Sequence, residues 1–259
     1  MPSDSPPGNH MLTDRPPVHE MGLSVQFAKD VPWTALDVTD FRSRIFEAYP
    51  DYREMPRASP MSVEPENRIV LGTNEGRRAW FISPDDLYVL QVQNDRVCRN
   101  WRSRVPTDAP SGYPGYNILA DQFDVDFEYF VEWLRQKTTD ANPITPNVGE
   151  LAYYNTISTA GGRRLSEILS FFKPNRRSDI IGFNAHWAEM LPVSFRAFTT
   201  VHTEVDLSRD GVPAVFATMI SRFDLSGCDI GGIRHRFDEV HGAYSQIVPH
   251  VLTDMALGR

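Results

Sequence analysis

The sequence has very little cysteine, since Cys98 and Cys228 are the only two among 259 residues. They are far apart and neither belongs to a CxxC pair, which excludes a disulfide scaffold and a four-cysteine zinc site. Such a chain is typical of a reducing compartment, so we predict a cytoplasmic protein. Long hydrophobic runs are also missing. None approaches the roughly 20 apolar residues that a membrane helix needs, so we expect no membrane partner.

Positive charge is in deficit, because 26 basic side chains face 34 acidic ones and leave a net charge of −8. Binding to nucleic acid or to an anionic membrane depends on surplus Lys and Arg, so the composition argues against both. A nucleic-acid-binding module stays a second alternative only if seven arginines converge on one surface. These are Arg99, Arg102, Arg104, Arg163, Arg164, Arg176 and Arg177.

Motifs that carry known chemistries are missing too. The chain has no GxSxG, HExxH or kinase-like pattern, and neither a GxGxxG turn nor a Walker lysine. We therefore assign no catalytic residue and no cofactor, and the sequence favours a noncatalytic protein over an enzyme.

The hydrophobic pattern predicts an α+β fold made of two similar halves. Residues 1–16 are polar and proline-rich, which predicts a disordered tail. Each half then has a strand, a helix, three or four antiparallel strands and a second helix. The N-terminal half covers residues 17–140, a proline-containing linker follows at 142–146, and the C-terminal half covers residues 147–259. Helices would cover one face of such sheets and leave the other face free for binding or for a homodimer.

Two hairpins can be given a register from the sequence. A turn at Asn94-Asp95 pairs Gln91 with Cys98 and Gln93 with Arg96 on a polar face. The opposite face is apolar except for Arg99. In the C-terminal half, the Asp210-Gly211 pair is typical of a two-residue turn.

With the C-terminal turn at that position, Val205 would face Phe216. On the other side of the sheet, His202 would face Met219 and Glu204 would face Ala217.

The segment QVQNDRVCRNWR at 91–102, followed by YPGY at 113–116 and a Phe-rich helix, resembles a known family. This is a sporadically distributed bacterial family of uncharacterised proteins of about this length. The resemblance spans most of residues 16–255 and implies a cytoplasmic, standalone module. It implies no catalytic residues, because none are recognised for the family.

The most suggestive candidate site is a polar row on the first hairpin, formed by Gln91, Gln93, Arg96 and Asn100. Amides and a guanidinium spaced two apart on strands project side by side and offer several donors to an anionic or amide-bearing ligand. The alternatives are a solvated sheet face or a set of hydrogen bonds to neighbouring loops. We favour recognition of a protein partner or small ligand through this row.

A metal-dependent, hydrolase-like enzyme is the alternative function. His202 and Glu204 lie two apart on a predicted strand and so share a face, and His186 on a preceding strand could supply a third ligand. The simpler interpretation is an exposed strand whose polar residues meet water.

A further cluster lies near the last helix, predicted to begin at about Phe237. It contains His235, Asp238, Glu239 and His241. Negative charge is favourable in the first turn of a helix, so we interpret Asp238 and Glu239 as capping residues.

Overall fold

The computed structural model describes residues 17–64, 77–106, 111–139, 143–159, 164–171, 184–207, 213–254 and 256–257. Within these ranges the chain forms nine strands and four helices. All nine strands belong to one antiparallel sheet, in the order β2-β3-β4-β5-β1-β6-β9-β8-β7. The predicted α+β class is therefore confirmed.

The strands are β1 (Val18–Phe27), β2 (Asp51–Pro56), β3 (Arg77–Ile82), β4 (Tyr88–Gln93), β5 (Arg96–Arg102), β6 (Pro146–Ser158), β7 (Asn184–Met190), β8 (Ala197–Leu207) and β9 (Pro213–Asp224). The helices are α1 (Ala35–Ile45), α2 (Tyr116–Lys137), α3 (Leu165–Ile168) and α4 (Ile230–Val251).

The first strand occupies the middle of the sheet, where it pairs with β5 on one side and β6 on the other. Its alternating pattern explains this position. Met21, Leu23 and Val25 are buried on the face that the helices cover, whereas Ser24 and Gln26 point to the opposite face. We call the second face the open face.

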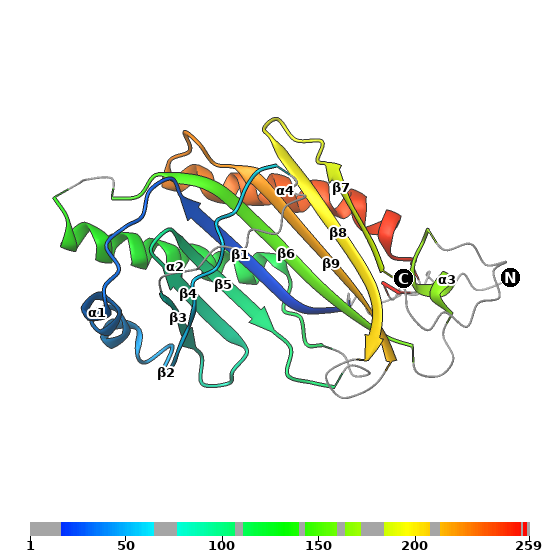
Figure 1. Ribbon diagram of the computed structural model, residues 1–259, viewed down its shortest axis with the longest axis horizontal. Coiled ribbons are helices and arrows are strands. Elements are labelled where there is room, and N and C mark those ends of the chain that lie inside the picture. The colour runs from blue at the N-terminus through cyan, green and yellow to red at the C-terminus, as the bar shows by residue number, and fades with distance from the viewer. Residues whose placement is uncertain are drawn as a thin grey trace, which may run out of the picture.

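Helices α2 and α4 lie behind the sheet in Figure 1, α2 against β5 and α4 against β6 and β9. The predicted apolar stripe of α2 is buried there, and it comprises Leu119, Phe123, Phe127, Phe130 and Leu134. Helix α1 joins the same layer, because the Phe41 ring lies 5.7 Å from that of Phe130 and 5.3 Å from that of Trp133. No helix in the described part of the chain combines the length and hydrophobicity that a membrane crossing requires.

The last helix begins earlier than predicted. Asp229 caps it by accepting a hydrogen bond from Gly232 N at 2.7 Å, so α4 starts at Ile230 rather than near Phe237. Asp238 and Glu239 are therefore not capping residues, and that interpretation was wrong.

These residues instead make side-chain contacts. Asp238 binds Arg234 and the Tyr116 hydroxyl, and Glu239 pairs with His235 at 2.8 Å. The His241 ring stacks on Tyr116 with centroids 3.9 Å apart. The cluster thus joins α4 to α2.

The first predicted hairpin has the predicted register. β4 and β5 pair Gln91 with Cys98, Gln93 with Arg96, and Leu90 with Arg99. The register holds because a slip of one residue would turn the apolar row away from the helices.

The second predicted register was wrong by one residue. Val205 faces Val215, His202 faces Thr218 and Glu204 faces Phe216. The strands end at Leu207 and Pro213, so an odd number of residues connects them, whereas a two-residue turn needs an even one. Asp210-Gly211 lies outside the described residues.

Other differences concern short elements. Strand β2 was missed, because Pro56 and the prolines after it favoured a loop. The predicted helix over 164–172 contains only α3 in its described part. The predicted tail at 1–16 and a predicted strand at 68–72 lie outside the described residues.

Candidate functional site

The predicted polar row lies on the open face of the sheet, along the β4–β5 hairpin. Gln91 donates to Asn100 Oδ1 at 2.7 Å, and Asn100 donates to Glu20 Oε1 at 2.7 Å. Gln93 is only 1% exposed. The four side chains do share one face, but they are less accessible than a solvated docking row would be.

Part of this row is covered by residues 57–64, which we call the strap. The strap runs across the open face in front of β1 in Figure 1. Gln26 donates to Met61 O at 3.0 Å, and Gln93 Oε1 accepts from Ala58 N at 2.9 Å. Arg96 donates to Ser59 O at 2.7 Å. Gln93 and Arg96 therefore anchor this segment.

Beside the strap the open face contains a pocket of about 120 Å³, which we call the open-face pocket. This volume corresponds to about four water molecules. Its lining residues come from β1, β3, β4, β5, β6 and the strap, and they are Ser24, Ala58, Arg78, Gln91, Gln93, Arg96, Cys98, Asn100, Glu150 and Tyr154. All four residues of the predicted row line it.

The pocket holds two guanidinium groups that lack an acidic partner. Arg78 donates to the neutral Gln91 Oε1 at 3.1 Å, and Arg96 donates to Gln26 Oε1 at 3.0 Å and to the strap. Neither forms an ion pair with any described residue, and the Nε of each is buried without a hydrogen-bond partner there. Burial lowers the pKa of both groups.

The acidic groups near the pocket already have partners. Glu150 accepts from Arg222 Nε at 2.8 Å, and Asp95 pairs with Arg57 at 3.0 Å. Burial raises the pKa of Glu20, and the hydrogen bond from Asn100 and the charges of Arg102 and Arg104 act against that rise. Glu150 and Asp95 attract the charge of Arg96 from a distance. Neither Arg78 nor Arg96 makes a direct ion pair with a carboxylate of the described residues.

The thiol of Cys98 lines the same pocket and donates to Asn100 Oδ1 at 2.9 Å. Burial raises its pKa to about 12, and the opposing effect of Arg96 is smaller. At neutral pH the sulfur is a protonated thiol, which is a poor nucleophile. The pocket therefore suits binding better than covalent chemistry.

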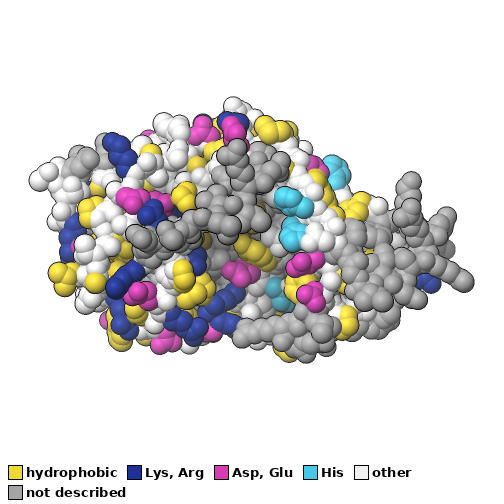
Figure 2. Space-filling view, viewed as in Figure 1, with side chains coloured by type: hydrophobic (Ala, Val, Ile, Leu, Met, Phe, Trp, Pro, Cys, Tyr) yellow, Lys and Arg dark blue, Asp and Glu magenta, His cyan; other side chains and the backbone are white. Residues whose placement is uncertain are grey.

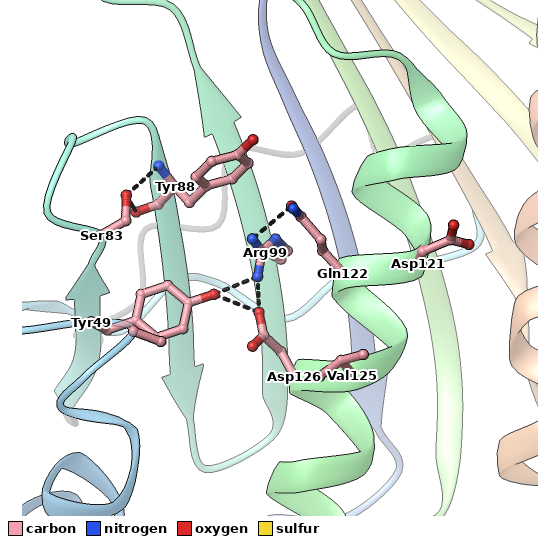
Figure 3. A pocket seen from close by; sticks show the side chains of 9 residues that line it. Tyr49, Ser83, Tyr88, Arg99, Asp121, Gln122, Val125 and Asp126 are labelled. Carbon is pink, nitrogen blue, oxygen red and sulfur yellow. Dashed lines mark hydrogen bonds and ion pairs between the residues drawn. The ribbon is translucent and has the colours of Figure 1, made fainter.

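A larger pocket of about 390 Å³ lies on the other side of the sheet, between α2, β4, β5 and the end of α1. We call it the helix-side pocket (Figure 3). It is lined by Ala48, Tyr49, Ser83, Tyr88, Arg99, Asp121, Gln122, Val125 and Asp126.

Arg99 lies at the centre of the helix-side pocket and is 6% exposed. It pairs with Asp126, donates to the Tyr49 hydroxyl and donates to Gln122 Oε1 at 2.8 Å. Its guanidinium carbon lies 4.8 Å from the centre of the Tyr88 ring. In contrast to Arg78 and Arg96, this arginine has a carboxylate partner.

Burial raises the pKa of Asp126, and the charge of Arg99 and the hydrogen bond from Tyr49 act against that rise. Tyr49 donates to Asp126 Oδ2 at 2.6 Å. Burial, together with the nearby Asp126 charge, raises the pKa of Tyr49. Its phenol therefore stays protonated at neutral pH.

The predicted metal ligands lie together on the open face of β7 and β8. His186 faces His202 across the two strands, with ring centroids 6.2 Å apart, and His202 Nε2 lies 3.7 Å from Glu204 Oε2. No group of three His, Cys, Asp or Glu side chains within the described ranges is arranged to hold a metal ion. A metal-dependent activity stays a prediction.

Two of the arginines proposed for nucleic acid, Arg99 and Arg102, lie on opposite faces of the sheet. Arg99 points to the helix side, whereas its strand neighbour Arg102 points to the open face and pairs with Asp86. Arg104 also pairs with Asp86. Arg163, Arg176 and Arg177 lie outside the described residues.

The sequence did not identify Arg78 of the open-face pocket or the Arg99–Asp126 pair of the helix-side pocket as site residues. Arg78 was seen only as the start of a strand, and its place beside Arg96 depends on the pairing of β3 with β4. Arg99 did give a signal, because it interrupts an apolar row. Its partner Asp126 could not be identified without knowing how α2 packs on β5.

Comparisons of this chain with protein-family models, with curated proteins and with solved structures find no match.

Proposed function

We propose that this protein is a noncatalytic binding protein that recognises an anionic group of a protein partner or small ligand in the open-face pocket. The observation that carries the proposal is the pair of guanidinium groups, Arg78 and Arg96, that line one pocket without an acidic partner. A buried charge without a counter-charge is costly, and a bound anion would remove that cost.

The shape and composition of the pocket support a compact oxyanion, such as a phosphate or a carboxylate. The volume of about 120 Å³ admits a group of a few heavy atoms. Asn100 and Gln91 add amide groups to the two arginines, and hydrogen bonds from charged donors to oxyanions are among the strongest in proteins. The same pocket could accept a free small anion or an acidic side chain of a partner.

Charged side chains are unevenly distributed over the open face. In Figure 2 many Lys and Arg side chains lie over the part of the sheet formed by β2–β5, with Asp and Glu side chains among them. Histidines gather over the part formed by β7–β9. The overall charge of −8 would repel anions at a distance, so we expect recognition to depend on short-range contacts with Arg78 and Arg96.

We also propose that the chain is built from two similar halves. β1 and β6 are each followed by a helix, a run of antiparallel strands and a long helix. In both cases the last strand of the run, β5 or β9, pairs with the first strand of its half. The described N-terminal run has four strands and the C-terminal one has three.

The test uses inorganic phosphate as the probe and isothermal titration calorimetry at constant ionic strength. We expect wild-type protein to bind phosphate and Arg78→Gln to bind it about tenfold more weakly. A tenfold change in affinity corresponds to the loss of one charge-assisted hydrogen bond. Arg78 is chosen because Arg96 also holds the strap. Arg53→Gln is the matched control, since Arg53 lies exposed on the same face but outside the pocket.

Equal affinity of wild type and Arg78→Gln would overturn the site, as would an equal loss in Arg53→Gln. Circular dichroism of each variant shows whether the fold is retained. If Arg78→Gln is not folded, Gln91→Leu tests the same pocket.

A further inference from the structure

The helix-side pocket is an open depression with the volume of a small-molecule site. Its volume of about 390 Å³ lies within the usual range for such sites, which are mostly apolar with a few placed polar groups. The rings of Tyr49 and Tyr88 and the side chains of Ala48 and Val125 supply apolar surface. Val125 is 67% exposed, which an aliphatic side chain at the mouth of a binding pocket explains.

The charges in this pocket cancel. Arg99 is neutralised by Asp126, and Asp121 pairs with Arg234 at 2.8 Å. An anion would have to compete with Asp126 for Arg99, and a cation would have to compete with Arg99 for Asp126. The electrostatics therefore disfavour ligands of either sign and favour an uncharged one.

Two hydrogen-bonding atoms remain free one helical turn apart on α2. Asp126 uses Oδ2 for Tyr49 and Arg99, and its Oδ1 has no partner among the described residues. Gln122 uses Oε1 for Arg99, and its Nε2 has no partner there either. Together they offer one acceptor and one donor.

We propose that the helix-side pocket binds an uncharged planar molecule, aromatic or heteroaromatic, that carries an amide-like donor and acceptor. The ring would lie among Tyr49, Tyr88 and Val125, where aromatic side chains favour flat apolar groups. The amide-like group would donate to Asp126 Oδ1 and accept from Gln122 Nε2. This site is separate from the open-face pocket and its ligand is of a different class.

Three probes of nearly equal shape test the charge argument: benzamide is neutral, benzoate is anionic and benzamidine is cationic. Binding to the full chain is followed by saturation-transfer NMR and by titration of assigned amide resonances. We expect benzamide to bind at least about fivefold more tightly than either charged probe. Equal or tighter binding of a charged probe at this pocket would overturn the proposal.

Matched tyrosine variants locate the binding. Tyr88→Ala removes one wall of the pocket and should weaken benzamide binding by about tenfold. Tyr129→Ala is the control, because Tyr129 lies exposed on α2 but does not line the pocket. If Tyr88→Ala does not fold, Gln122→Leu removes the donor without removing a wall. A benzamide affinity unchanged in both Tyr88→Ala and Gln122→Leu would also overturn the proposal.

The outcome is distinguishable from that for the proposed function. Phosphate titrated into the same samples reports on the open-face pocket, and Tyr88→Ala should leave that affinity unchanged. Loss of phosphate binding in Arg78→Gln, with benzamide binding retained, separates the two sites.

Discussion

Arg96 and Arg99 of strand β5 lie three residues apart and differ in whether they have an ion-pair partner. Arg96 points to the open face and contacts only neutral acceptors, whereas Arg99 points to the helices and pairs with Asp126. The difference arises from strand geometry, because neighbouring positions alternate between faces and an odd separation places two residues on opposite sides. One strand thus carries Arg96, which has no direct carboxylate partner among the described residues, and Arg99, which has one.

The helix side should show the larger loss of stability when a partner is removed. Asp126→Ala leaves Arg99 buried without a counter-charge, and we expect the free energy of unfolding to fall by about 3–5 kcal/mol in urea denaturation. Arg78→Gln on the open face removes a charge that has no ion-pair partner, so we expect a change below about 1 kcal/mol.

The double variant Arg99→Met with Asp126→Leu is the control for this comparison. Replacing both members of a buried pair by apolar residues should recover most of the lost stability. If Arg78→Gln proves as destabilising as Asp126→Ala, the contrast between the two arginines is wrong.

Buried titratable groups on the helix side should also make stability depend on pH. Burial lowers the pKa of His241, which packs between Tyr116 and Tyr153. The folded state therefore favours the neutral ring. Its contribution to stability is complete above the unfolded pKa of about 6.5 and is lost as pH falls below it, by at most about 1.4 kcal/mol per pH unit.

Urea denaturation at several values between pH 7.5 and 5.5 measures this slope. His241→Gln should be less stable at pH 7.5 but should have a flatter pH dependence than wild type. His250→Gln is the control, since His250 is exposed on the same helix. A wild-type slope retained in His241→Gln would assign the dependence to other groups.

The smallest effect is expected at the thiol of the open-face pocket. Nearby arginines usually activate a cysteine, but burial outweighs Arg96 here and keeps the pKa of Cys98 at about 12. We expect Cys98 to react with a thiol reagent at pH 8 at least about tenfold more slowly than Cys228. Cys228→Ala, which leaves only Cys98, isolates the slow phase. Rapid modification of that variant would show that the pocket activates its thiol.

The sequence was most informative where one periodic row had to be buried. The β4–β5 register followed from residues 88–102 alone, because the turn at Asn94-Asp95 sets the pairing and a one-residue slip would separate Tyr88, Val92 and Val97. The β8–β9 register did not, since Asp210-Gly211 favoured a turn length that the strand ends exclude. A local turn preference was weaker there than the strand packing.

The candidate sites were only partly predictable for a similar reason. Gln91, Gln93, Arg96 and Asn100 were found from their spacing on two adjacent strands. The strap that covers two of them could not be, because Gln26 and Met61 are distant in sequence and the segment has no regular period. Asp126 likewise contacts Arg99 only through tertiary packing.

The pairing of β1 with β6 has a consequence for any attempt to divide this protein. These strands meet near the centre of the sheet over most of the length of β1. Cleavage of the chain near residues 140–142 into two separate fragments would leave β1 and β6 without their pairing. Each strand would then expose an edge of unpaired backbone N–H and C=O groups. These exposed edges can pair with other strands. We therefore expect the two fragments to associate when mixed and to aggregate when produced separately.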